Sequence, residues 1–92
     1  MTRIVHVNGE WLPEAEARVS VFDRGFLMAD GVYEVTSVLE GRLVDFAGHL
    51  ARLRRSLDAL SMPSPAGDGD LLALHREAVA RNAIDEGMVY CQ

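Results

Sequence analysis

Side chains that could form a metal site are sparse in this chain. The three histidines, His6, His49 and His75, lie far apart, and none has a cysteine or carboxylate at the spacing of a zinc site. We interpret each histidine as an ordinary polar or capping residue. Asp23 and Asp30 lack the alternating oxygen ligands of a calcium loop. The sequence therefore predicts no metal site.

Arg52 is the first candidate for a functional residue. Apolar residues spaced four and three apart predict one buried stripe along a helix: Phe46, Leu50, Leu53, Leu57 and Leu60. At 100° per residue, Arg52 projects about 120° away from this stripe, on the same flank as His49. From that flank an arginine can reach around the edge of a sheet toward a phosphate. The alternative is a solvated surface arginine.

Tyr33 is the second candidate. It follows Gly31 at the start of a predicted strand, where a phenol can point into a cleft. The alternative is a half-buried strand tyrosine whose hydroxyl is hydrated.

Charge and composition exclude several classes of function. All nine basic residues are arginine, so a reaction that needs a lysine amine cannot be completed by these residues alone. The net charge of -5 argues against a nucleic-acid partner. A single cysteine, Cys91, rules out an intramolecular disulfide and favours the cytoplasm. We expect no membrane partner, since no apolar run reaches the length of a membrane span.

The elements that must position these residues begin with an antiparallel sheet. Asn8-Gly9 predicts a hairpin between strands 4–7 and 10–13. We expect sharp backbone turns at Gly25 and Gly31, then a central strand over 32–39, covered on both faces. Glu40-Gly41 predicts a second tight turn, and 42–46 a returning strand, which together give a meander.

Two helices complete the predicted fold. The first carries the apolar stripe from 46 to 60. The second covers 71–84, with Asp68 or Asp70 as its cap and Gly87 at its left-handed end. A strand is expected from residue 88. The result is one α+β domain over residues 1–92, with an antiparallel sheet and two helices packed on one side.

Several of these residues resemble the motifs of a known family. "DRGFLMADGVYEV" at 23–35 followed by "HLARLRRS" at 49–56 is similar to the N-terminal small domain of the class IV, or fold type IV, pyridoxal-phosphate enzymes. The likeness covers the whole chain and is greatest to the D-amino acid aminotransferases. It implies a transaminase that moves an amino group between a D-amino acid, D-alanine-like, and a 2-oxo acid, with pyridoxal 5'-phosphate as cofactor.

The resemblance also assigns roles to the two candidates. It implies that Arg52, the arginine of the H-x-x-R-L series, binds the cofactor phosphate, and that Tyr33, the tyrosine of D-G-V-Y-E, lines the substrate side of the active site. In this family the cofactor-binding lysine lies in a C-terminal domain that this chain lacks. No catalytic residue is therefore expected here. The chain alone is expected to be an inactive, truncated part of a homodimer or higher homo-oligomer.

Other functions remain open at this point. A branched-chain aminotransferase or an aminodeoxychorismate lyase has the same fold. A binding or self-associating module without catalytic activity, descended from such an enzyme, is a further alternative, because 92 residues can fold alone.

Overall fold

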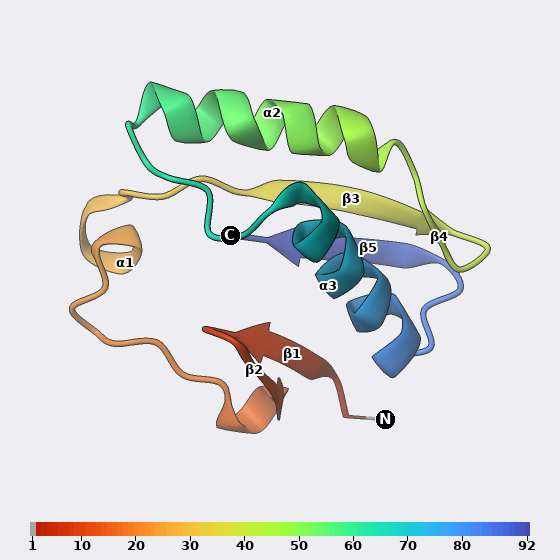
Figure 1. Ribbon diagram of the computed structural model, residues 1–92. Helices are drawn as coiled ribbons and strands as arrows, with labels where there is room; N and C mark the ends of the chain where they lie inside the picture. Colours follow the sequence, from red (N-terminus) through yellow and green to blue (C-terminus); the bar gives the residue numbers. More distant parts are fainter. Residues whose placement is uncertain (1) are drawn as a thin grey trace. The chain divides into compact units, whose positions relative to one another are not determined.

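The chain consists of two compact units, Met1–Gly31 and Val32–Gln92, shown in Figure 1. The computed structural model describes residues 2–92. The architecture is α+β, as predicted, but its strands form two separate antiparallel sheets, one of two strands and one of three. The single meander expected from the sequence is therefore wrong. No helix within residues 2–92 is long and apolar enough to cross a membrane.

The first unit begins with the predicted hairpin. Strands β1 (Ile4–Val7) and β2 (Glu10–Pro13) pair antiparallel. Asn8 and Gly9 both have positive φ, 49° and 91°, which is what a tight two-residue hairpin turn requires. A short 3-10 helix, η1 (Glu14–Glu16), follows.

A short helix, α1 (Arg24–Met28), occupies the segment where two glycine turns were expected. Asp23 caps it, since its side chain accepts a hydrogen bond from the Gly25 backbone N–H at 2.8 Å. The left-handed residue that ends α1 is Ala29, with φ of 53°. Neither Gly25 nor Gly31 has positive φ, so the expected role of these two glycines is wrong.

The second unit is built on a three-stranded sheet with the order β4-β3-β5. The central strand is β3 (Glu34–Leu39), which pairs antiparallel with β4 (Arg42–Leu43) and with β5 (Gly87–Cys91). Glu40 and Gly41 form the predicted tight turn, and both residues have positive φ. The returning strand is much shorter than expected, because Asp45 already caps the next helix.

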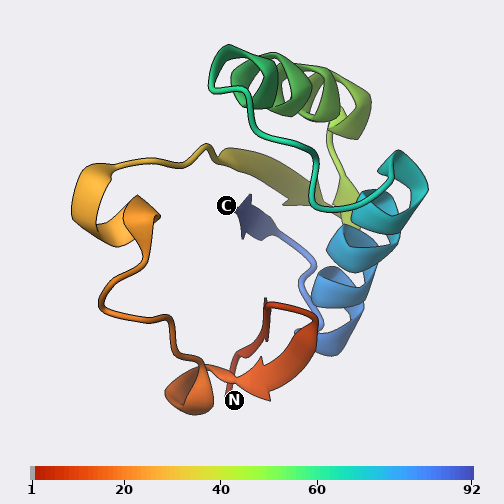
Figure 2. The ribbon, with the colours of Figure 1, turned by 60° about the vertical axis from the view of Figure 1, so that its left-hand side comes forward.

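Both long helices lie on the same side of this sheet. Figure 1 and Figure 2 show α2 (Phe46–Ala59) running along β3 in the opposite direction, with α3 (Asp68–Arg81) beside it. Gly67 precedes α3, so Asp68 and Asp70 lie in its first turn and do not cap it. The helix ends at Arg81, before the expected end at 84, and Gly87 belongs to β5.

The core of the second unit lies between the helices and one face of the sheet. Alternation along β3 buries Glu34, Thr36 and Val38, whereas Ser37 and Leu39 are exposed. The expectation that β3 is covered on both faces is therefore wrong in this chain. Leucines from both helices form the main apolar cluster: Leu53, Leu57 and Leu71.

Candidate functional site

A buried carboxylate is the centre of the candidate site. Glu34 is the first residue of β3 and lies on the face that the helices cover, so only 6% of it is exposed. A buried ionised carboxylate is costly unless it is paired and hydrogen-bonded. The partners of Glu34 come from helix α2.

Arg52 is the main partner of this carboxylate. Its Nε donates to Glu34 Oε2 at 2.7 Å, and its Nη2 donates to Glu34 Oε1 at 2.9 Å. Two parallel bonds of this kind hold a guanidinium in one plane and one direction. The flank position predicted for Arg52 is the reason that it reaches β3 from a helix whose apolar stripe faces the core.

His49 is the second partner. It lies one helical turn before Arg52, and its Nδ1 lies 2.7 Å from Glu34 Oε1. Because an ionised carboxylate only accepts hydrogen bonds, the Nδ1–H of His49 is the donor. His49 and Arg52 therefore donate hydrogen bonds to the same carboxylate from adjacent turns of one helix face.

This pairing fixes the charge state of the network. Hydrogen bonding from Arg52 is the main cause that lowers the pKa of Glu34 from its usual 4.5 to about 2, against the effect of burial. Hydrogen bonding to Glu34 in turn raises the pKa of Arg52 above its usual value. Glu34 is thus an anion and Arg52 a cation at neutral pH.

The guanidinium of Arg52 keeps one edge for an anionic ligand. Glu34 occupies the edge formed by Nε and Nη2, and within residues 2–92 the Nη1 group has no hydrogen-bond partner. The side chain of Arg52 is 60% exposed. The edge formed by Nη1 and the outer N–H of Nη2 is therefore accessible, and its planar geometry suits a phosphate or carboxylate.

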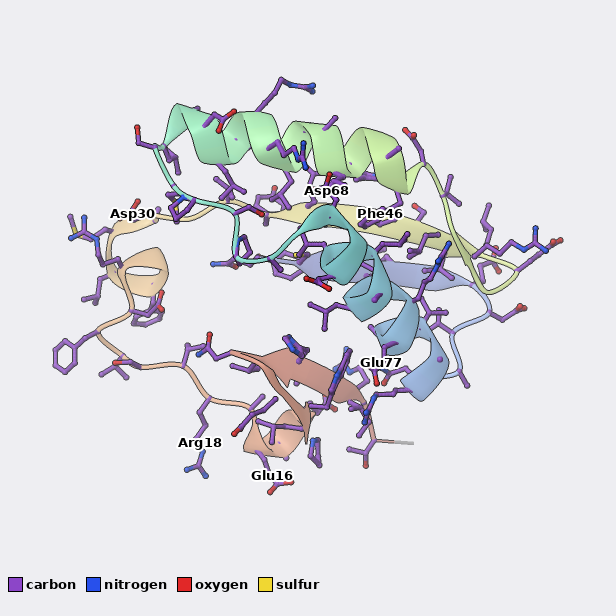
Figure 3. All side chains as sticks on the ribbon, viewed as in Figure 1. Glu16, Arg18, Asp30, Phe46, Asp68 and Glu77 are labelled. Carbon is purple, nitrogen blue, oxygen red and sulfur yellow. The ribbon has the colours of Figure 1, made fainter. Side chains whose placement is uncertain are left out.

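The two neighbouring arginines of α2 differ from Arg52. Arg54 forms an ion pair with Asp68 at the start of α3; Figure 3 labels Asp68. Arg55 is exposed. Neither residue contacts Glu34, which makes them useful controls for the role of Arg52.

Tyr33 directly precedes β3. It is 61% exposed and stacks on Tyr90 of β5, with ring centroids 5.6 Å apart and an angle of 22° between the planes. Within residues 2–92, no hydrogen bond joins Tyr33 to Arg52. The two predicted site residues are connected through the chain by Glu34, which follows Tyr33 directly and accepts the hydrogen bonds of Arg52.

A small cavity of about 10 Å³ lies behind the Glu34 carboxylate. Its polar lining includes Thr36, His75 and Cys91. Among residues 2–92, Thr36 Oγ1 has no hydrogen-bond partner. His75 is a core residue: its Nδ1–H donates to Leu71 O at 2.7 Å, and its ring packs edge-on against Phe46, which Figure 3 labels. Burial, and then the charge of Glu34, raises the pKa of the Cys91 thiol.

Neither Glu34 nor His49 was predicted as a site residue from the sequence. His49 was interpreted as an ordinary polar or capping residue, and Glu34 was given no role. The spacing of His49 and Arg52, three residues apart on one helix, was the available signal that both side chains share a face. The buried acceptor that they share becomes visible only in the tertiary structure.

Comparisons with known proteins agree with this division of the chain. The family described as amino-transferase class IV matches residues 31–92, which is nearly the extent of the second unit. The matched residues include Tyr33, Glu34, His49 and Arg52.

The whole chain is similar to D-alanine aminotransferases. It is 34% identical over 88 residues to the D-alanine aminotransferase of Staphylococcus aureus strain MSSA476, covering 96% of this chain and 31% of that protein. It is 33% identical to the Staphylococcus haemolyticus enzyme, with the same coverage. The Listeria monocytogenes serotype 4b strain F2365 enzyme is 35% identical, and 30% of its length is covered. The chain thus spans about a third of the length of these curated relatives.

Proposed function

Because this chain belongs to the class IV aminotransferase family, we propose that it forms the N-terminal part of a transaminase that moves an amino group between a D-amino acid and a 2-oxo acid. The observation that carries the proposal is the similarity to D-alanine aminotransferases over 96% of the chain. These relatives favour the D-amino acid substrate class over the branched-chain and aminodeoxychorismate alternatives.

Pyridoxal 5'-phosphate is the cofactor that we propose, and the geometry of Arg52 fits it. The phosphate is a dianion that needs fixed donors, and the free edge of Arg52 offers two N–H groups in one plane. When bound, this cofactor supplies the electron sink for transamination. The part of Arg52 is to bind the phosphate and so to orient the ring.

Tyr33 is proposed to line the substrate side of the site. Its exposed ring and its stacking on Tyr90 give it a defined orientation without burying it. A phenol held in this way can donate a hydrogen bond to a substrate carboxylate or exclude water from one side of the substrate.

A second domain is needed to complete the enzyme that we propose. The chain has no lysine, and the relatives are about three times as long as the matched region. We propose that the cofactor-binding lysine lies in that further part of the protein and that residues 1–92 alone do not catalyse the reaction. We also propose that the complete enzyme is a homodimer.

A direct assay tests the proposed reaction. The full-length protein, supplied with pyridoxal phosphate, D-alanine and a 2-oxo acid, is expected to produce pyruvate. L-leucine and L-alanine as amino donors are the matched controls, because a branched-chain enzyme would use L-leucine. Turnover with L-leucine and none with D-alanine would contradict the proposed substrate class.

A further inference from the structure

We propose that Glu34 is a positioning residue, which holds Arg52 so that the free edge of its guanidinium meets the cofactor phosphate, and that His49 in turn holds Glu34. The inference rests on the proposed function, since it concerns how the phosphate is bound. The family motifs assign no role to Glu34 or His49.

The first support is that Glu34 is a rigid anchor. It is on the central strand of the sheet, its side chain is 7% exposed, and both of its oxygens accept hydrogen bonds. A carboxylate bound on both oxygens and enclosed by packing cannot change rotamer freely. It therefore offers a fixed reference point for a mobile partner.

The second support is that Arg52 has no other partner to fix it. Its side chain is 60% exposed, and within residues 2–92 its only hydrogen bonds are those to Glu34. A free arginine side chain loses conformational entropy when a ligand immobilises it. Because Glu34 has already ordered Arg52, much of that loss occurs on folding and not on binding.

The charge of Glu34 opposes the gain in phosphate affinity that comes from ordering Arg52. The negative charge of Glu34 reduces the attraction of Arg52 for a phosphate dianion. However, three hydrogen bonds from Arg52 and His49 disperse the charge of Glu34, and exposed groups are screened by water. We infer that the ordering of the guanidinium outweighs the repulsion. The two effects predict opposite changes in the affinity for pyridoxal phosphate when Glu34 is replaced by glutamine.

The test compares the affinities of pyridoxal phosphate and pyridoxal for the full-length apoprotein, measured by absorbance titration. The dissociation constant of pyridoxal divided by that of pyridoxal phosphate, here called the ratio, isolates the contribution of the phosphate. Glu34→Gln is expected to weaken pyridoxal phosphate binding about three- to tenfold, which corresponds to losing part of the ordering of Arg52. Pyridoxal binding is expected to stay the same. A general loss of stability would weaken the binding of both ligands equally and leave the ratio unchanged.

A second variant separates position from charge. Glu34→Asp keeps the charge but shortens the side chain by one methylene, so it too is expected to reduce the ratio. If charge repulsion dominates, Glu34→Gln will bind pyridoxal phosphate more tightly and Glu34→Asp will behave as wild type. Either of those results would overturn the proposal.

A matched control is available on α3. Glu77 accepts two hydrogen bonds from Arg81 and is labelled in Figure 3, so Glu77→Gln makes the same chemical change in an exposed pair. It is expected to leave the ratio at the wild-type value. If Arg52→Ala lowers the ratio and Glu34→Gln does not, the positioning role is wrong and the proposed function stands. If Arg52→Ala has no effect, the phosphate assignment itself is wrong.

Discussion

At the scale of single residues, the burial of Glu34 is the feature with the clearest consequence. The fold places an ionised carboxylate on the covered face of β3 and supplies two donors from one helix. Removing one partner of such a group leaves the other without its hydrogen bonds, which costs more than the pair contributes in total. Arg52, His49 and Glu34 are therefore expected to respond to substitution as one unit.

Acid is expected to weaken the fold through Glu34. Because the folded state lowers the pKa of Glu34 from 4.5 to about 2, the unfolded state binds the proton more readily. The stabilisation is therefore complete above about pH 4.5 and is lost as the pH falls toward 2. Allowing for the exposure of Arg52, about 1 to 2 kcal/mol depends on this carboxylate.

The measurement is the free energy of unfolding as a function of pH for wild type and Glu34→Gln. The difference between the two proteins is expected to shrink between pH 4.5 and pH 2, because the glutamine has no proton to bind. A difference that is constant across this range would show that Glu34 is not held as an anion in the folded state.

Part of the candidate site could be predicted from the sequence at this scale. The apolar stripe predicted that Arg52 lies on a flank of the helix, and in the structure Arg52 occupies that flank of α2. The role of Glu34 could not be derived, since a glutamate in a strand is exposed or buried according to which face is covered, and pattern alone does not decide this for "VYEVTSVL". Its link to Arg52, 18 residues further along the chain, is a tertiary contact.

At the scale of elements, the start of α2 determines where His49 and Arg52 lie. Asp45 is in the left-handed region with φ of 53°, and its side chain accepts a hydrogen bond from the Gly48 N–H at 3.3 Å. Asp and Asn tolerate both this backbone conformation and the capping role, whereas alanine suits neither.

Asp45→Ala is therefore expected to lower the free energy of unfolding by about 1 to 2 kcal/mol. Asp45→Asn is the control, and it is expected to change stability by less than about half of that. Denaturant unfolding of both variants makes the comparison. Equal losses for alanine and asparagine would mean that the cap does not stabilise α2.

The elements that the sequence predicted correctly are those with strong local signals. Both hairpin turns contain a glycine, and the first also an asparagine, which tolerate positive φ. The stripe of α2 is correct from Phe46 to Leu57, but Leu60 lies outside the helix and is 46% exposed. The short helix α1 was missed because five residues carry too little periodicity to distinguish a helix from a turn. The separation of the strands into two sheets was missed because it depends on pairing between distant segments, such as β3 with β5.

At the scale of the whole molecule, both units expose large apolar side chains. Phe22, Phe26 and Met28 in the first unit and Met88 and Tyr90 in the second are each more than half exposed. Exposed apolar side chains of this size are common at sites that another domain or subunit covers. This is what we expect of a chain that spans about a third of its relatives.

Mass measurements distinguish a transaminase from a small self-associating module. Under the proposed function, the natural protein is about three times longer than this chain and elutes as a dimer in size-exclusion chromatography with light scattering. A natural product of 10.1 kDa would favour the module. A strictly monomeric full-length protein at high concentration would contradict the proposed homodimer.

The central claim is that Arg52 holds the cofactor phosphate, and its most direct test is the affinity of the full-length apoprotein for pyridoxal phosphate after single arginine substitutions in α2. Arg52→Ala is expected to weaken binding roughly ten- to a hundredfold, the range for loss of a charge-assisted contact. Arg54→Ala and Arg55→Ala are expected to bind as wild type, because neither side chain contacts Glu34. Equal effects of all three substitutions would contradict the assignment of Arg52.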